Sequence, residues 1–567
     1  MPATIAQRRE ALTQRIPTWT PLTLDQRLDH AAQEFGARDY VVTDPRTYSY
    51  LDIKVWSERI AGGLVEAGVR RGDHVAIVLA NFPEFVAVKY AIARVGATCI
   101  PINFLNRRDE LGYVLRQSDA VLLITMDQFR GLDYLTALDE LAPGWERDGG
   151  GEAFPRLKRV VVFPTSDAPV RADAFSFAEL AAPKQVFAGL ADADPYSVCD
   201  IIYTSGTTGS PKGVMLTHDM LLRAAFGSVY SRAFDDAWRV VFSLPMYHVY
   251  GYIEGVLTVP FVGGAIVPQL LFNPAATLGA IEQHRADDVL LVPTMTLALL
   301  DELRARRYEL PTLRAVISSG QRSPTAIWKA IFEELHPAEV TTGYGMTEVT
   351  ATMMMTQPDD SFERLSSTNG RMRDVGPAGD PALGGKLVEY KVVDPESGRT
   401  LTPGEVGELR ARGPCVTRGY YNKPEATAAA FDDDGWLRTG DLGRFDEDGY
   451  LTLVGRLKES YRCGGEQVMP TEVEDVLTSH PAVLQAHVVP VPDRRMGEAG
   501  AAFVVLRSEP PATPDELMKF CADRLARFKT PKYVLPILAE ELPTTPSGRA
   551  RKFLLSQRAV ELLGLSQ

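Results

Sequence analysis

The segment from Tyr203 to Gly213, YTSGTTGSPKG, combines three glycines, several serine and threonine hydroxyls and a lysine. Glycines let the backbone approach an anion closely, and consecutive backbone N–H groups in such a loop form an anion-binding concavity. The hydroxyls add donors, and Lys212 adds a compact positive charge. Because these groups directly follow the apolar approach VCDII, the pattern favours a phosphate-binding loop over a polar surface turn. It differs from the P-loop of NTPases, since the segment contains no Gly-Lys dipeptide.

Four further segments with chemically useful side chains follow this loop along the chain. They are LPMYHVYG (244–251), GYGMTE (343–348), GWLRTGD (435–441) and GRLKESYRCGGEQVMPTEVE (455–474). In content and order, the five segments resemble the motifs of the adenylate-forming superfamily. That superfamily includes acyl- and aryl-CoA synthetases, luciferases and the adenylation domains of peptide synthetases. The resemblance covers nearly the whole chain and favours the acyl-CoA synthetase branch.

The resemblance implies a two-step reaction that uses ATP, Mg²⁺ and coenzyme A. A carboxylate and ATP first give an acyl-adenylate (acyl-AMP) and pyrophosphate. A small lid domain then rotates, and a thiol attacks the adenylate to give a thioester and AMP. Because a carboxylate is a poor nucleophile and ATP is a dense anion, the first step depends on positioning and charge neutralisation.

The resemblance also assigns nucleotide contacts to individual residues. Glu348 would hold Mg²⁺, a cation that prefers oxygen ligands. Tyr344 would stack on adenine, Asp441 would accept both ribose hydroxyls, and Thr347 would touch the α-phosphate. The remaining predicted nucleotide contacts are Thr204, Ser205, Gly206, Thr207, Thr208, Lys212, Gly320, Gly343, Gly345 and Arg456.

Other residues match the acid pocket, the hinge and the thiol site of the family. Lys458 matches the hinge between the large domain and the lid. The segment that meets the pantetheine arm of coenzyme A matches Gly464, Gly465 and Glu466, and the acid pocket matches Tyr247, His248, Tyr250 and Gly251. The predicted catalytic set is Lys212, His248, Thr347, Glu348 and Arg549.

Several of these residues also have purely structural explanations when each is taken alone. Asp441 is also explained as an aspartate in a turn, and Tyr344 as a tyrosine of the core. His248 is also explained as a core histidine whose hydrogen bonds are satisfied. Within the ordered set of motifs, the functional interpretation is favoured for Asp441, Glu348 and the phosphate loop. For His248, a general pocket wall and a gate to the CoA tunnel remain equally open.

The chain departs from the family in its C-terminal motif, LPTTPSGRARK (542–552). The residue after this glycine is a lysine in the family, where it bridges the carboxylate and the α-phosphate during adenylation. Here the position is Arg549, whose planar guanidinium differs in shape from a compact ammonium. Lys552 lies three residues further on and is not an obvious substitute. Gln321 and Arg322 are a second departure, because smaller residues are usual beside the adenine.

These departures suggest that adenylation is impaired while thioester formation from acyl-AMP and CoA is retained. A separate adenylating enzyme would then supply the acyl-AMP. The loop, Glu348 and Asp441 speak against this hypothesis, and Lys212 does so most strongly because it serves the pyrophosphate leaving group. The alternatives are a complete ATP-dependent ligase that tolerates Arg549, a stand-alone adenylating enzyme that loads a carrier protein, a luciferase-like oxidase, and an inactive nucleotide sensor.

The elements that must position these residues are read from the apolar pattern. Short apolar runs such as 75–79, 98–103, 120–125 and 289–294 are expected to be strands. They alternate with helical stretches, including one from Pro83 to about Arg94, which predicts mostly parallel sheets covered by helices. From Lys386 the pattern changes to antiparallel strands with tight turns, typical of a small β-barrel-like part. We therefore predict an α/β fold, with a large domain over residues 1–457 and an α+β lid over 458–567.

Composition limits the class of protein and its partners. The 567 residues carry 60 Lys and Arg against 73 Asp and Glu, a net charge of −13, which argues against nucleic acid as a partner. The longest uncharged run, 255–281, is interrupted by prolines and glycines, so no membrane span is predicted. Five widely spaced cysteines and no signal peptide predict a cytoplasmic protein without disulfides.

The acid itself is predicted only by class. The presumed pocket segments, 247–269 and 292–300, are apolar and aromatic and contain no lysine or arginine to pair a second carboxylate. This composition suits a hydrophobic acid, whether aryl, fatty or bulky and polycyclic. Glu254 is the one formal charge in these segments. The identity of the acid and the oligomeric state cannot be read from the sequence.

Overall fold

The computed structural model describes residues 3–166, 171, 173–204, 210–320, 323, 325–507, 512–545 and 550–565. Its first part is a seven-stranded sheet that is parallel except for the antiparallel pair β10 and β11. The strands in spatial order are β11 (Lys212–Thr217), β10 (Val198–Thr204), β4 (Thr98–Pro101), β3 (His74–Val78), β5 (Ala120–Met126), β8 (Arg159–Phe163) and β9 (Phe175–Ser176).

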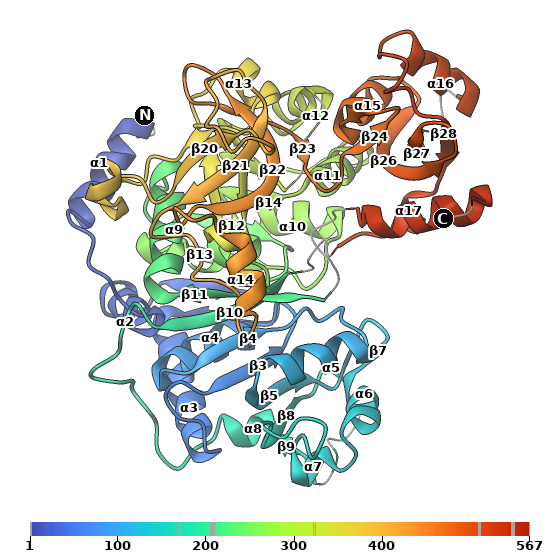
Figure 1. Cartoon of the computed structure of the whole chain (residues 1–567). Helices are drawn as coiled ribbons and strands as arrows, with labels where there is room; N and C mark the ends of the chain where they lie inside the picture. The colour runs from blue at the N-terminus through green and yellow to red at the C-terminus, as the bar shows by residue number, and fades with distance from the viewer. Residues whose placement is uncertain are drawn as a thin grey trace.

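A second seven-stranded sheet forms the middle of the molecule (Figure 1). It is parallel except where β1 pairs with β2 at one edge. Its strands in spatial order are β16 (Glu339–Thr341), β15 (Ala315–Ser318), β14 (Asp288–Leu291), β12 (Arg239–Phe242), β13 (Ala265–Pro268), β1 (Asp39–Val42) and β2 (Thr47–Ser49). The two sheets confirm the predicted α/β class.

Helices cover both sheets, and two of them are buried nearly all round. Every residue of α4 (Pro83–Val95) from Phe85 onward is buried, and α9 (His218–Ser231) is buried over most of its length. A helix that is apolar on all faces belongs in the centre of a large core. The other main helices are α1 (Ile5–Arg15), α2 (Leu24–Phe35), α3 (Tyr50–Glu66), α5 (Arg108–Gln117), α6 (Tyr134–Leu141), α10 (Pro274–His284), α11 (Pro293–Ala305), α12 (Thr325–Ala330) and α13 (Phe362–Ser367).

Ion pairs cross the buried interior and connect distant parts of the large domain. Lys89 of α4 contacts Asp200 of β10, with both side chains almost fully buried. Two further buried pairs are Arg232–Asp288 and Arg373–Glu254. Removing one partner of such a pair leaves an uncompensated charge in the core, at a cost of about 3–5 kcal/mol. These pairs therefore fix the packing of the helices against the sheets.

Two small antiparallel sheets follow the parallel ones; the second lies in the part predicted from Lys386, and the first begins earlier, at Gly343. One contains β17 (Gly343–Met346), β18 (Ala351–Met355) and β19 (Arg371–Met372); the other contains β20 (Glu389–Val393), β21 (Gly407–Arg412), β22 (Leu437–Phe445) and β23 (Leu451–Arg456). Their shared core contains Tyr344, Met354, Val392, Leu409 and Leu451. This packing brings the 343–348 motif beside the 435–441 motif.

The C-terminal part has its own sheet and its own apolar clusters, and it lies beside β23 (Figure 1). Thr471 donates a hydrogen bond to the carbonyl oxygen of Val454, which ties this part to β23. Its elements are β24 (Tyr461–Cys463), β25 (Glu466–Val468), α15 (Pro470–Thr478), β26 (Val483–Asp493), β27 (Gly497–Leu506), α16 (Pro514–Ala522), β28 (Tyr533–Pro536) and α17 (Lys552–Leu563). The predicted hinge at Lys458 and the boundary there stay predictions.

Two further observations concern the compositional predictions. All five cysteines are buried and free. Among the described residues, no helix combines the length and apolarity needed to cross a membrane. The uncharged run 255–281 instead forms a short 3-10 turn, strand β13 and most of helix α10.

Candidate functional site

Three predicted nucleotide-binding side chains meet at the end of the small β sheets. The hydroxyl of Tyr344 donates to Asp441 Oδ2 at 2.8 Å, and Arg456 Nε lies 2.8 Å from Asp441 Oδ1. Asp441 and Arg456 are direct cross-strand partners on β22 and β23. Asp441 is only 5% exposed. Since a carboxylate offers about four acceptor positions, Asp441 keeps acceptor capacity beyond these two contacts.

The electrostatics of this trio follow from its burial. Burial raises the pKa of Tyr344 well above its ordinary value, and the neighbouring Asp441 carboxylate raises it further. Burial disfavours the charge of Arg456, but the carboxylates of Asp441 and Glu459 outweigh this effect and raise its pKa. At neutral pH the tyrosine is therefore neutral and the arginine is charged. The trio offers a donor, an acceptor and a cation in one small region.

Glycines are required where β17 passes close to β18. A Cβ on Gly345 would lie 1.8 Å from the carbonyl oxygen of Ala351, and one on Gly343 would lie 2.6 Å from the carbonyl oxygen of Met354. Only a residue without a side chain fits so close to a neighbouring backbone. The glycines of the 343–348 motif thus allow β17 to pack closely against β18. This close packing holds Tyr344, which lies between the two glycines, in its place.

We expect Gly345→Ala to destabilise the fold by at least about 2 kcal/mol, because the added methyl overlaps backbone atoms that have little room to move. Gly279→Ala is the matched control: it lies within helix α10 with no atom within 4 Å of an added Cβ. There, alanine should stabilise the protein by about 0.5–1 kcal/mol. Urea unfolding of both variants measures the difference, and equal stabilities would contradict this explanation of Gly345.

Of the predicted phosphate loop, the structure describes the two ends, up to Thr204 and from residue 210 onward. Thr204 ends β10 and Lys212 begins β11, and the two residues are direct partners in an antiparallel hairpin. Lys212 Nζ lies 4.8 Å from the centre of the Tyr420 ring. Burial and the repulsion of Lys458 lower the pKa of Lys212, while Glu348 opposes the shift. Ser205, Gly206, Thr207 and Thr208 lie outside the described residues.

Thr347 and Glu348 lie in a short 3-10 turn, Thr347–Val349, and both are buried. The hydroxyl of Tyr420 donates to Glu348 Oε1 at 3.0 Å. Burial raises the pKa of Glu348, as expected for a carboxylate removed from water. The described residues contain no cluster of three metal-ligating side chains. A single carboxylate nevertheless fits Mg²⁺, which usually binds one or two carboxylates together with substrate phosphates.

The 244–251 segment leads into an unusual π-helix, Tyr250–Val256. The Tyr250 hydroxyl donates to the carbonyl oxygen of Leu291 at 3.0 Å, so this tyrosine anchors the π-helix to β14. A Cβ on Gly251 would lie 2.6 Å from the carbonyl oxygens of Leu244 and Pro245. Both residues therefore shape the backbone of the segment. Such π-helical turns are frequent at functional sites.

Two polar groups of the same segment are available to a ligand. His248 Nδ1 accepts the backbone N–H of Tyr250 at 3.2 Å, and burial lowers its pKa to about 4. We infer from this bond that the neutral ring carries its proton on Nε2. The buried hydroxyl of Tyr247 has no hydrogen-bond partner among the described residues, and its ring packs edge-on against Phe104 at 5.3 Å.

The predicted thiol-site glycines form the turn of the β24–β25 hairpin. Gly464 and Gly465 have φ of +63° and +91°, and Cys463 pairs with Glu466 across the turn. A two-residue hairpin turn with both φ values positive is the typical place for a glycine pair. Glu466 and Lys458 are exposed. The hairpin geometry explains the glycines, and their contact with pantetheine stays a prediction.

Arg549, Gln321 and Arg322 lie outside the described residues. Lys552, three residues after Arg549, is among the described residues. Its ammonium lies 2.7 Å from Glu474 and 3.3 Å from Glu459, so it is held within the lid. The neighbouring Arg551 is close enough to Tyr247 to lower its pKa, although burial still raises that pKa well above its ordinary value.

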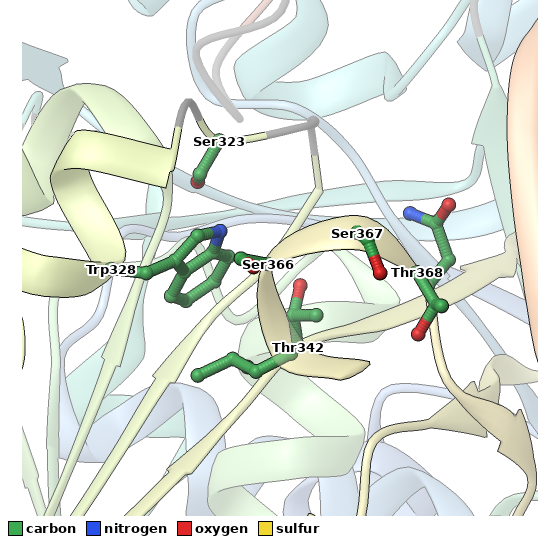
Figure 2. A pocket seen from close by; sticks show the side chains of 8 residues that line it. Ser323, Trp328, Thr342, Ser366, Ser367 and Thr368 are labelled. Carbon is green, nitrogen blue, oxygen red and sulfur yellow. The ribbon is translucent and has the colours of Figure 1, made fainter. Parts of the chain in front are cut away.

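A small hydroxyl-lined cavity lies between helices α12 and α13 (Figure 2). Separately, Ser319, the residue before Gly320, donates to the carbonyl oxygen of Gly343 at 2.8 Å, which joins the end of β15 to β17. The cavity measures about 10 Å³, which is room for one water molecule and not for a substrate. Its lining residues are Ser323, Trp328, Thr342, Leu365, Ser366, Ser367, Thr368 and Asn369.

Sequence reasoning missed Tyr420, which contacts both Lys212 and Glu348. The segment RGYYNKPEAT around it contains two adjacent tyrosines, and nothing in their spacing shows which one faces the site. The contact depends on the pairing of residue 420 with Val214 of β11. That pairing is a tertiary feature, which a sequence pattern does not carry.

Comparison with known proteins agrees with this geometry. The family described as AMP-binding enzyme matches residues 28–421, and the family described as AMP-binding enzyme C-terminal domain matches residues 472–549. A putative acyl-CoA synthetase, YngI of Bacillus subtilis, is 36% identical over 96% of this chain and 98% of its own length. A methyl-dioxo-octahydroindenyl-propanoyl:CoA ligase of Mycobacterium tuberculosis is 32% identical over 94% of this chain and 97% of its own.

Solved structures share the fold over almost the whole chain. The o-succinylbenzoate CoA synthetase of Bacillus subtilis, in complex with its acyl-adenylate intermediate, gives a TM-score of 0.77. It is 26% identical, and the match covers 95% of this chain and 98% of that one. The resemblance seen in the motifs is thereby confirmed. The chain belongs to the AMP-binding enzyme family, the adenylate-forming enzymes that include the acyl-CoA synthetases.

Proposed function

We propose that this protein joins a hydrophobic carboxylic acid to coenzyme A through an acyl-adenylate. The observation that carries the proposal is the convergence of Tyr344, Asp441 and Arg456 at the end of the small β sheets. A buried carboxylate flanked by a donor and a cation suits a ribose with two hydroxyls and a nearby phosphate. Both acyl-AMP and ATP carry these groups, so one site serves both half-reactions.

The two half-reactions follow from the groups around this site. In the first, a carboxylate oxygen of the acid bonds to the α-phosphorus of ATP, and pyrophosphate leaves. Lys212 neutralises the departing phosphates, and Thr347 donates to the α-phosphate. Glu348 would hold Mg²⁺, and that ion would supply further neutralisation of the phosphate charge. In the second, the thiolate of coenzyme A bonds to the acyl carbon, and AMP leaves.

The apolar character of the acid rests on the surroundings of the pocket segment. Glu254, the one formal charge there, is fully buried, accepts a hydrogen bond from Ser228 and pairs with Arg373 at 3.4 Å. It is therefore occupied within the core. Tyr247 and Phe104 add an aromatic wall. A relative named for a bicyclic propanoyl acid supports a bulky substrate.

A panel of acids tests this function. Aryl, fatty and polycyclic acids are each supplied free, with ATP, Mg²⁺ and CoA, and also as preformed adenylates with CoA. We expect at least one apolar acid to yield acyl-CoA, detected by mass spectrometry together with AMP. A dicarboxylic acid of similar size serves as the control and should give none. Transfer to a carrier protein with no transfer to free CoA would contradict the proposal and support the carrier-loading alternative.

The finer part of the proposal is that Arg549 impairs the adenylation half-reaction. The planar guanidinium replaces a compact ammonium between two oxyanions, in a closing site that is sensitive to displacements of about 1 Å. The engagement of Lys552 with Glu474 and Glu459 supports the proposal, because it removes the nearest lysine as a replacement. A separate enzyme would then supply the acyl-AMP.

Comparing the two routes in parallel tests this part. Thioester formation from acyl-AMP and CoA should exceed that from acid, ATP and CoA by at least about tenfold, a difference of 1.4 kcal/mol in barrier. Equal rates by the two routes would overturn the impairment and leave a complete ATP-dependent ligase. The lid division at Lys458 is part of the same proposal, since the second step needs a different lid position from the first.

A further inference from the structure

Tyr420 lies between two residues to which the proposed function gives different roles, Glu348 for Mg²⁺ and Lys212 for pyrophosphate. Its hydroxyl donates to Glu348 Oε1 at 3.0 Å, while its ring lies 4.8 Å from Lys212 Nζ. Tyr420 as a whole residue is 9% exposed. One aromatic residue therefore contacts the carboxylate that would hold Mg²⁺ and the cation that would neutralise pyrophosphate.

Backbone hydrogen bonds hold Tyr420 rigidly beside the phosphate loop. Residue 420 bridges to Val214, and the N–H groups of Met215 and Tyr421 donate to the carbonyl oxygens of Gly419 and Gly213, respectively. The segment around Tyr420 thus runs along β11 as a short extra strand. The ring of Tyr420 is therefore held next to β11, the strand that begins with Lys212.

The same segment is also fixed to the turn that carries Glu348. The N–H of Thr417 donates to the carbonyl oxygen of Glu348 at 2.7 Å. The N–H of Tyr420 donates to Thr427 Oγ1 at 2.9 Å, which anchors it to α14 (Pro424–Ala430). Residues 417–420 therefore connect β11 to the 3-10 turn through short backbone contacts. A shift of either element moves the tyrosine.

We infer that Tyr420 is a positioning residue that sets the relative placement of Lys212 and Glu348, which makes metal binding and phosphate binding interdependent. The inference rests on the proposed function, because that function gives these two residues their roles. The hydroxyl orients the carboxylate, leaving its second oxygen for a ligand. The ring attracts the ammonium through its negative face and limits where the lysine reaches.

The hydroxyl contact of Tyr420 with Glu348 can be removed while the ring contact with Lys212 is kept. Tyr420→Phe keeps the ring under Lys212 and removes the hydroxyl from Glu348. A hydrogen bond to a charged group is worth enough to change an equilibrium about tenfold or more. We therefore expect about a tenfold higher Mg²⁺ concentration for half-maximal ATP binding. Tyr420→Leu removes both contacts and should also weaken the binding of ATP in the absence of Mg²⁺.

Calorimetric titration of the full-length protein with ATP, with Mg²⁺ and with chelator, tests the inference. The matched control is Tyr421→Phe, since the Tyr421 hydroxyl donates to Asp119 on the far side of the segment at 2.9 Å. The control should bind ATP as the wild type does. AMP binding should be unchanged in all variants, because AMP has no β- or γ-phosphate, and this shows that they are folded.

A double-mutant cycle distinguishes a positioning role of Tyr420, which acts through Glu348, from a general effect on the fold. If Tyr420 acts through Glu348, adding Tyr420→Phe to Glu348→Gln should not raise the Mg²⁺ requirement further. An additive effect, or a Tyr420→Phe variant with wild-type Mg²⁺ dependence, would overturn the inference. If Tyr420→Phe does not fold, Tyr420→Leu replaces it: a raised Mg²⁺ requirement for ATP binding supports the inference, and a wild-type requirement overturns it. A wild type that binds AMP and not ATP would overturn the inference while leaving thioester formation from acyl-AMP intact.

Discussion

Arg549→Lys is expected to raise the rate of adenylation by about tenfold to a hundredfold. A lysine ammonium is compact and has three rotatable donors, so it fits between a carboxylate and an α-phosphate. A misplacement of about 1 Å at such a point costs up to about a hundredfold in rate, which sets the size of the expected gain. Exchange of labelled pyrophosphate into ATP in the presence of the acid measures this step alone.

The matched control is Arg558→Lys, the same exchange of side chains at an arginine of α17 that pairs with Glu541. It should leave pyrophosphate exchange unchanged within about twofold, a difference of less than 0.5 kcal/mol in barrier. Thioester formation from acyl-AMP and CoA should be unaffected by Arg549→Lys, because that step does not need this cation. If both variants gain equally, or neither does, the explanation through Arg549 is wrong.

Asp441→Asn is expected to lower both half-reactions by about a hundredfold. The carboxylate would accept two ribose hydroxyls, and each hydrogen bond to a charged group is worth about 1.5–3 kcal/mol. The change also leaves the charge of Arg456, 2.8 Å away, without its partner. Because ATP and acyl-AMP share the ribose, the loss should be similar by either route. Initial rates with acid and ATP, and with acyl-AMP, measure it.

Asp448→Asn provides the control for Asp441→Asn. Asp448 lies in the turn between β22 and β23, pairs with Arg364 and has a 68% exposed side chain. Exposed pairs contribute about 0–1 kcal/mol, so this variant should keep wild-type activity and stability. A wild-type rate in Asp441→Asn, with the control also unchanged, would remove Asp441 from the nucleotide site.

The sequence predicted the elements best where local chemistry determined them. The strand at 120–125 is β5, and the helix predicted from Pro83 is α4, because proline suits the first turn of a helix. The strand expected over 289–294 ends earlier, at Leu291, since Pro293 begins helix α11. Pro293 is a signal for the start of a helix, just as Pro83 is, but the prediction extended the strand past it.

The candidate site was predicted as a set of motifs, and its internal contacts were not. The pairing of Asp441 with Arg456 depends on the register of β22 and β23, and the bond from Tyr344 depends on how two sheets pack. Tyr420 reaches the site through an extra strand beside β11. These are tertiary arrangements of residues far apart in sequence, so local patterns contain no signal for them.

A single-turnover reaction of the wild-type protein with preformed acyl-AMP and CoA, without ATP, tests the central claim most directly. The proposed site binds the adenylate through Tyr344, Asp441 and Arg456 and passes the acyl group to the thiol. We therefore expect acyl-CoA and AMP to appear in equal amounts as the adenylate disappears, faster than its spontaneous hydrolysis. Adenylate that stays intact, or that gives free acid and AMP without thioester, would contradict this account.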